Sequence, residues 1–234
     1  MRAQLAKLGN LALDFVLPQN CLGCGKEGRV LCQTCTTRLP RILPPFCRRC
    51  GLPITHEPCP DCSRQEPFFD GLRAPFRFEN LAREAIHLLK YKNIRCLAAP
   101  LAGEMACYLR HNPLPVDLVI PVPLHRMRLR ERGYNQSELV AAHLGSVLGL
   151  EVDRTSLRRV LNTRPQVSMT RGAAHRRHNM AGAFQCREKT VSQRSVLLID
   201  DVATSGATIS NCALSLKKAG ASSVWGLTIA REVL

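Results

Sequence analysis

The sequence predicts an α/β fold in which a doubly wound, mainly parallel sheet follows a small zinc-binding region. Three features support this class. Short β-rich runs alternate with longer helical segments from residue 72 onward, eight cysteines are concentrated before residue 63, and one apolar run leads into two adjacent aspartates. Strands that alternate with helices favour a parallel sheet with right-handed crossovers.

The boundary between the two regions is expected at residues 63–70, where Pro67 and the pair Asp70-Gly71 interrupt the chain. We therefore expect a zinc-binding domain at 1–66, which begins with a short helix, and an α/β domain at 67–234. The elements of the second domain are expected in the following order: a strand at 72–78, helices at 80–92 and 97–110, a strand at 117–120, a helix at 136–148, a strand at 158–161, a strand at 196–199, a helix at 207–218 and a strand at 222–229.

The cysteines before residue 63 form four Cys-x-x-Cys pairs, which predict two tetrahedral zinc sites. The expected ligands are Cys21, Cys24, Cys32, Cys35, Cys47, Cys50, Cys59 and Cys62. Adjacent pairs that each form a small ribbon are favoured over a crossed arrangement. A disulfide framework is the alternative, but it requires an oxidising compartment, and Asp14 interrupts the only candidate export signal. Since no apolar run reaches the roughly 20 residues that span a bilayer, we expect no membrane insertion, and the many thiols favour a cytoplasmic location.

The chain is strongly basic, with a formal net charge of +15, and its arginines are clustered. One cluster, interrupted only by Glu131, comprises Arg126, Arg128, Arg130 and Arg132. Residues 154–177 hold seven more arginines, without any Asp or Glu: Arg154, Arg158, Arg159, Arg164, Arg171, Arg176 and Arg177. Neither segment has a clear period, so we expect loops that bind nucleic acid or phosphorylated ligands. A solvated basic surface is the alternative.

The run 196–208 carries the most specific signal, because an apolar strand leads into Asp200 and Asp201 and then into small hydroxylated residues. Adjacent carboxylates repel unless a cation or hydroxyl groups engage them, as ribose hydroxyls or Mg²⁺ would. Hydroxyl groups and backbone N–H groups at a helix N-terminus bind phosphate. The residues expected to do so are Ala203, Thr204, Ser205, Gly206, Ala207 and Thr208. An ordinary strand, turn and helix, with Thr204 or Ser205 as a cap, is the alternative.

This run resembles the phosphoribosyl-pyrophosphate (PRPP) motif of type I phosphoribosyltransferases. The whole chain is similar to the ComF/GntX family of bacterial proteins, which combine a double zinc ribbon with a phosphoribosyltransferase domain. Its landmarks are the four cysteine pairs and seven further segments. These segments are 89–92, 121–124, 130–136, 163–166, 177–179, 183–184 and 200–208. Only Ala207 departs from the motif, at a position where Thr or Ser is frequent.

The resemblance implies roles for individual residues. Asp200 and Asp201 would be the catalytic pair that faces the ribose hydroxyls, and 203–208 would hold the 5′-phosphate. Residues 121–132 would form the pyrophosphate loop, with Pro123, Leu124, Arg130 and Arg132 as contacts, and 159–177 would form a lid that carries Arg164, Arg171 and Arg177. The family link also implies a role in DNA uptake (competence) or the use of imported DNA, with DNA-uptake or DNA-processing proteins as partners.

These features predict a phosphoribosyltransferase-like protein that binds PRPP with Mg²⁺ and single-stranded DNA. Whether it is an enzyme stays open at this point, because no acceptor site is recognisable in the sequence. The alternatives are a non-catalytic nucleic-acid-binding accessory protein and a conventional phosphoribosyltransferase without a DNA role. Polar aromatic residues that could stack on bases are few, namely Tyr91, Tyr108, Tyr134 and Trp225, so backbone charge is expected to dominate DNA binding.

Overall fold

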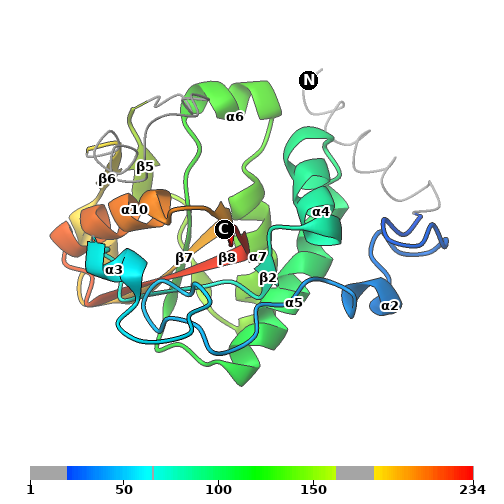
Figure 1. The fold of residues 1–234 in the computed structure, drawn as a ribbon. Helices are drawn as coiled ribbons and strands as arrows, with labels where there is room; N and C mark the ends of the chain where they lie inside the picture. The colour runs from blue at the N-terminus through cyan, green and yellow to red at the C-terminus, as the bar shows by residue number, and fades with distance from the viewer. Residues whose placement is uncertain (1–19, 65, 162–181, 234) are drawn as a thin grey trace, which may run out of the picture.

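The computed structural model describes residues 20–64, 66–161 and 182–233 (Figure 1). The expected N-terminal helix and the expected lid residues Arg164, Arg171 and Arg177 lie outside the described residues. None of the helices in the described ranges is long and apolar enough to cross a membrane.

A six-stranded parallel sheet forms the centre of the molecule. Its strand order is β1-β8-β7-β3-β4, and β2 continues β1 along the same edge of β8. The strands are β1 (Gly71–Arg73), β2 (Phe76–Arg77), β3 (Leu118–Pro121), β4 (Glu151–Val152), β7 (Ser195–Ala203) and β8 (Ser223–Arg231). A separate antiparallel pair joins β5 (Leu157–Arg159) to β6 (Phe184–Cys186).

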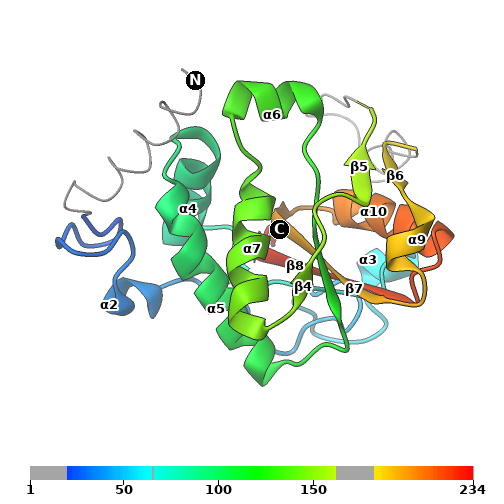
Figure 2. The same ribbon diagram turned by 180° about the vertical axis from the view of Figure 1, so that it is seen from behind.

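Helices cover both faces of the sheet (Figures 1 and 2). One face carries α4 (Asn80–Tyr91), the short 3₁₀ helix η1 (Arg95–Leu97), α5 (Ala98–His111) and α7 (Gln136–Leu148). The other face carries α10 (Ala207–Lys218). Leu197 and Ile199 of β7 belong to the core of the first face, whereas Val196 and Leu198 belong to the core beneath α10. An unalternating apolar run is therefore required in β7, because both of its faces are covered.

Several expected strands differ from the structure. The strand expected at 72–78 is interrupted between β1 and β2, because Pro75 has no N–H to donate to the neighbouring strand. The strand expected at 158–161 begins one residue earlier and belongs to the small antiparallel pair rather than to the main sheet. The two-residue strand β4 was not expected. The strand expected to end at residue 199 continues to Ala203.

The arginine cluster at 126–132 was expected to be an irregular loop, and this expectation is wrong. It forms the helix α6 (Arg126–Arg132). The His125 side chain accepts a hydrogen bond from the Met127 N–H at the N-terminus, and Gly133 ends the helix with a φ of +79°, which favours glycine. No residue of α6 is buried, and the helix projects from the upper end of the sheet in both views (Figures 1 and 2).

The cysteine-rich region packs against the sheet domain in two places. It contains two short helices, α2 (Gln33–Thr36) and α3 (Pro60–Arg64). Cys21, Leu31 and Cys35 share a hydrophobic core with α4. Further along, the Leu72 N–H of β1 donates a 2.7 Å hydrogen bond to the carbonyl of Arg49, which lies between two of the cysteines. The region therefore contacts both a helix and an edge strand.

Gly71 provides a test of the packing between β1 and β8. A Cβ atom at Gly71 would lie 2.3 Å from the Trp225 ring. We expect Gly71→Ala to lower the free energy of unfolding by about 1–3 kcal/mol, because the ring has to move. Gly103 in α5 is the control, since a Cβ there meets nothing within 4 Å. Gly103→Ala should stabilise the protein by about 0.5–1 kcal/mol. Urea denaturation measures the free energy of unfolding of both variants. Equal changes in the two variants would contradict the close packing of Gly71 against Trp225.

Candidate functional site

Asp200 and Asp201 lie within β7, close to its carboxyl end, and the loop Thr204–Gly206 joins the strand to α10. The sequence placed the aspartates after the strand, but the strand includes them. This difference matters because a strand residue has a fixed orientation, and successive side chains point to opposite faces. Ligands of open α/β sheets bind at this end of the strands.

Asp201 is only 5% exposed and is held by two neighbouring helices. Lys90 of α4 places its Nζ 2.7 Å from Asp201 Oδ1. Gln136, the first residue of α7, donates a 2.5 Å hydrogen bond from Nε2 to Asp201 Oδ2. A buried carboxylate without such partners would be strongly destabilising. The negative charge of Asp201 is therefore compensated by groups of the chain itself.

Asp200 is held differently, because no cation contacts it directly in the described residues. Its Oδ1 accepts hydrogen bonds from the Ser137 hydroxyl, at 3.0 Å, and from the Asp201 N–H, at 2.9 Å. Burial, together with the neighbouring Asp201 charge, raises the pKa of Asp200 to about 7, although Lys90 lowers it in part. Asp200 is therefore harder to ionise than an ordinary aspartate.

The sequence predicted that a cation or hydroxyl groups would have to engage the acidic pair. The chain itself provides a cation, Lys90, and a hydroxyl group, that of Ser137. Lys90, Gln136 and Ser137 were not identified as site residues from the sequence. Lys90 and Gln136 do lie in two of the landmark segments, 89–92 and 130–136, and this was the available signal. Their contacts with β7 depend on tertiary packing, which a sequence pattern does not show.

A chain of hydrogen bonds connects this pair to α6. Arg132 donates from Nη1 to Gln136 Oε1, and the same amide donates to Asp201. The neighbouring Tyr134 is buried and donates its hydroxyl hydrogen to the carbonyl of Leu89 in α4. Asn135 donates to the carbonyl of Val122 at 3.0 Å and caps α7. The segment between α6 and α7 is thus fixed to α4 and to the end of β3.

The expected phosphate residues occupy the loop and the first turn of α10, but they are not equally accessible. Thr204 is exposed, whereas Ser205 and Thr208 are partly exposed. Gly206 adopts a φ of +72°, which strains any other residue. Ala203 and Ala207 are buried, so only their backbone groups could contribute to the expected phosphate site. The accessible hydroxyl groups are those of Thr204, Ser205 and Thr208.

The expected pyrophosphate loop runs from the end of β3 into α6. Pro123 and Leu124 are partly exposed and precede α6, and Arg130 is exposed on it. Arg132 is the member of this set that the structure links to the acidic pair, through Gln136.

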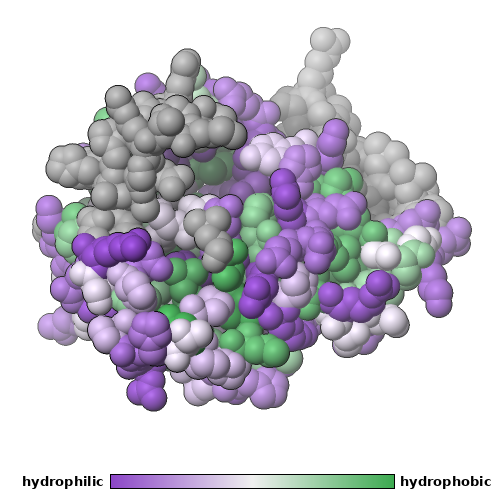
Figure 3. All heavy atoms as spheres, in the orientation of Figure 1, coloured by the Kyte–Doolittle hydropathy of each residue, from purple (hydrophilic) through white to green (hydrophobic). Residues whose placement is uncertain are grey.

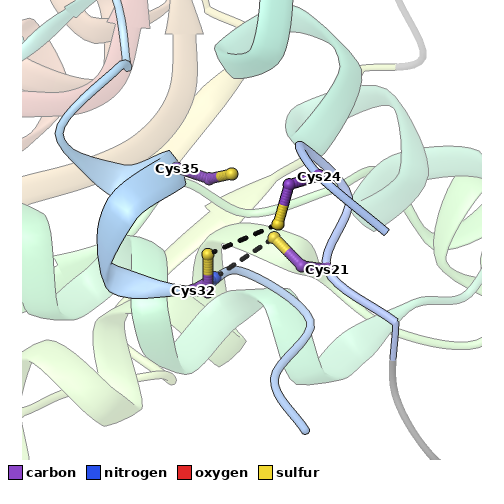
Figure 4. A group of neighbouring side chains, drawn as sticks. All are labelled: Cys21, Cys24, Cys32 and Cys35. Atoms are coloured by element: carbon purple, nitrogen blue, oxygen red, sulfur yellow. Dashed lines mark hydrogen bonds between the residues drawn. The ribbon is translucent and has the colours of Figure 1, made fainter. Parts of the chain in front are cut away.

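The eight cysteines form two groups of four, in the adjacent pairing that the sequence favoured. The groups are Cys21, Cys24, Cys32 and Cys35, and Cys47, Cys50, Cys59 and Cys62. Within each group all sulfur atoms lie within 4.8 Å of one another. Figure 4 shows the first group converging from one turn and from α2.

The sulfur distances fit zinc and not disulfides. The Cys24–Cys32, Cys47–Cys62 and Cys50–Cys59 sulfur atoms lie 3.7, 3.8 and 3.6 Å apart. A tetrahedral site with Zn–S bonds of about 2.3 Å requires about 3.8 Å between sulfur atoms. Backbone N–H groups of Arg49 and Cys50 point to the Cys47 sulfur at 3.4 Å, which favours the thiolate that zinc requires. These residues would hold two structural zinc ions.

A parallel α/β sheet with two four-cysteine groups defines the chain as an α/β protein with a double zinc ribbon. A family model described as a double zinc ribbon domain matches residues 12–63. The DNA utilization protein YhgH of Escherichia coli O157:H7 is 31% identical over 202 residues, which cover 83% of this chain and 87% of that protein. Competence protein F of Haemophilus influenzae is 29% identical over 208 residues, covering 84% and 89%.

The chain belongs to the ComF/GntX family, as its sequence landmarks predicted. Competence protein ComFC of Bacillus subtilis is a more distant relative, with 24% identity over 216 residues that cover 88% of this chain and 86% of that protein. Among solved structures, the glutamine PRPP amidotransferase of B. subtilis is similar with a TM-score of 0.42 and 14% identity, over 61% of this chain and 30% of that chain. The expected fold class, a mainly parallel α/β sheet after a double zinc ribbon, is confirmed.

We expect purified protein to carry close to two zinc ions per chain, measured by plasma mass spectrometry. Cys24→Ser and Cys59→Ser should each lower the content to near one, because the two groups are separate. Cys107→Ser is the control, since Cys107 belongs to neither group and should leave the content at two. Zinc-free protein after reducing, chelator-free purification would contradict the assignment.

Proposed function

We propose that this protein binds PRPP with Mg²⁺ at the carboxyl end of β7, binds single-stranded DNA through the arginines of α6, and acts in the cytoplasm in the uptake or use of imported DNA. The observation that carries the first part is the position of Asp200 in front of the loop and helix N-terminus of α10. The names of the relatives, which are competence and DNA utilization proteins, support the role in the uptake or use of DNA.

The two aspartates would have different tasks at such a site. Both oxygens of Asp201 already contact Lys90 and Gln136. Asp200 uses Oδ1 for its hydrogen bonds within the described part of the chain, which leaves Oδ2 for a ribose hydroxyl. Asp200 would therefore contact the sugar, and Asp201 would position Asp200. The sequence had predicted that both aspartates contact the ribose.

The anionic groups of PRPP would be held by separate parts of the site. The 5′-phosphate would accept hydrogen bonds from Thr204, Ser205 and Thr208 and from the backbone N–H groups that begin α10. The pyrophosphate would lie towards Arg130 and Arg132. Mg²⁺ bound with PRPP would supply further positive charge at the pyrophosphate oxygens.

This arrangement supports transfer of the ribosyl phosphate. In such a step the bond from C1 to the pyrophosphate oxygen breaks, pyrophosphate leaves with the bonding electrons, and an incoming nucleophile bonds to C1. Positioning and stabilisation of the leaving charge are the main contributions that a protein makes to this displacement. Release of pyrophosphate, measured with and without single-stranded DNA, separates an enzyme from a protein that only binds PRPP.

The DNA part of the proposal rests on α6. Four arginines lie on seven residues that project from the sheet, and none of the seven is buried. Figure 3 shows hydrophilic side chains gathered over this helix at the upper edge of the molecule. Arginines on an exposed helix can follow a phosphate backbone without reading the bases.

Asp200→Asn tests the sugar site. We expect it to weaken PRPP binding by about 1.5–3 kcal/mol, because a hydrogen bond to a charged group is lost, while the Lys90–Asp201 pair stays intact. Asp117→Asn is the matched control: Asp117 lies at the opposite end of the sheet, where it pairs with Arg194. Calorimetry measures both variants, with zinc content as a check of folding. Unchanged affinity in folded Asp200→Asn protein would overturn the PRPP proposal.

Salt dependence tests the α6 surface. Affinity for a labelled single strand should fall with salt, with a log–log slope of about −0.7 for each phosphate contacted. Arg130→Ala should make the slope less steep by about 0.7, equally for different sequences. Arg110→Ala, at the end of α5, is the control and should leave the slope unchanged. Absence of DNA binding at low salt would refute the DNA role and leave the PRPP proposal standing.

A further inference from the structure

Tyr91 is an exposed aromatic residue close to the candidate site, and the proposed functions above do not use it. It is the last residue of α4 and is 63% exposed. In the described residues the only other exposed aromatic side chain is Phe68, at 48%. Burying the apolar surface of a ring is favourable, so an exposed ring beside a ligand site can bind a ligand that covers it.

The Tyr91 ring is held by two neighbours rather than standing alone. The Arg132 guanidinium carbon lies 5.3 Å from the ring centroid, which is a cation–π contact. The His87 ring, one turn earlier on α4, lies 4.8 Å away at an angle of 52°. These contacts already restrict the ring, while most of its surface stays exposed. Stacking of a planar ligand on Tyr91 would therefore cost little side-chain conformational entropy.

The same neighbours connect Tyr91 to the acidic pair. Arg132 contacts Tyr91 and also donates to Gln136, which in turn donates to Asp201. Lys90, the residue before Tyr91, pairs with Asp201 at 2.7 Å. A group that stacks on Tyr91 would therefore lie next to the proposed sugar site and beside α6.

The charges around the ring define what kind of planar group fits. Arg132 is adjacent, and Lys92 and Arg95 follow within the next four residues, with Arg95 itself stacked on Tyr134 at 4.5 Å. Aromatic rings with flanking cations are the combination that binds single-stranded nucleic acid, because bases stack on the rings while phosphates pair with the cations. A planar group linked to phosphate is therefore favoured over an uncharged aromatic compound.

We infer that Tyr91, with Arg132 and His87, forms a stacking platform for an unpaired nucleobase of a single strand. This inference rests on the proposed DNA binding and adds a contact to the bases, whereas the other arginines of α6 would contact only phosphates. It also places one base of the bound strand on the side of the site where Lys90 and Gln136 hold Asp201. Such a base is a candidate for the acceptor group that the sequence did not reveal.

The test compares an oligothymidylate with an oligonucleotide of the same length in which the bases are missing, by fluorescence anisotropy at one salt concentration. Wild-type protein should bind the base-bearing strand more tightly. Tyr91→Ala should weaken this binding by about 5- to 150-fold, the range expected for loss of one stacked base, and should change abasic binding by less than about twofold. Tyr91→Phe should retain most of the affinity, because the ring remains. Phe68→Ala removes the other exposed aromatic side chain of the described residues, which lies beside α10 rather than on α4, and should behave as wild type.

The outcomes separate this inference from the proposal beneath it. Equal wild-type affinity for the two strands, or an equal loss on both strands in Tyr91→Ala, overturns the platform while DNA binding through phosphates stands. If wild-type protein binds neither strand, the DNA proposal fails and the platform with it. If free thymidine competes for the platform as well as the strand does, compared per base, the site is one for a free nucleoside, and the single-strand assignment is overturned.

Discussion

The compensation of one buried carboxylate determines how the candidate site is built. Asp201 lies near the end of a central strand, where it is 5% exposed, and a charge in that position has to be paired. Lys90 from α4 and Gln136 from α7 meet this need. Because Gln136 must approach Asp201, the pairing also positions Arg132, which donates a hydrogen bond to the same amide. The neighbouring Asp200 then has a polar environment without a direct cation, which suits it to bind a sugar.

The zinc ribbons connect to this site through packing. The first four-cysteine group shares a hydrophobic core with α4, the helix that carries Lys90. The second supports β1, since the Arg49 carbonyl accepts a hydrogen bond from Leu72. Leu72 and Phe69 in turn lie 3.4 and 3.5 Å from the place of a Cβ on Gly206, in the loop before α10. The ribbons therefore pack against both sides of the proposed ligand site, although none of their eight cysteines belongs to it.

Much of this could be predicted from local signals, and the rest depends on contacts between distant residues. The bounds of α7 and α10 follow from their sequence, and the spacing of the cysteines predicts both four-cysteine groups. The helix α6 was missed because alternating arginines and apolar residues have no helical period, and its ends depend on His125 and Gly133. The extension of β7 through the aspartates, and their pairing with Lys90, Gln136 and Ser137, follow from the packing of α4 and α7 against the sheet. No local pattern encodes that packing.

The central claim is that Lys90 compensates the acidic pair, and an NMR titration of the carboxyl carbons of labelled aspartates tests it most directly. The Asp200 signal, assigned with Asp200→Asn, should titrate with a pKa of about 7. In Lys90→Met the pKa of Asp200 should rise further, because removal of the nearby cation disfavours the charged carboxylate. An Asp200 pKa near its ordinary value, unchanged in folded Lys90→Met protein, would contradict the account.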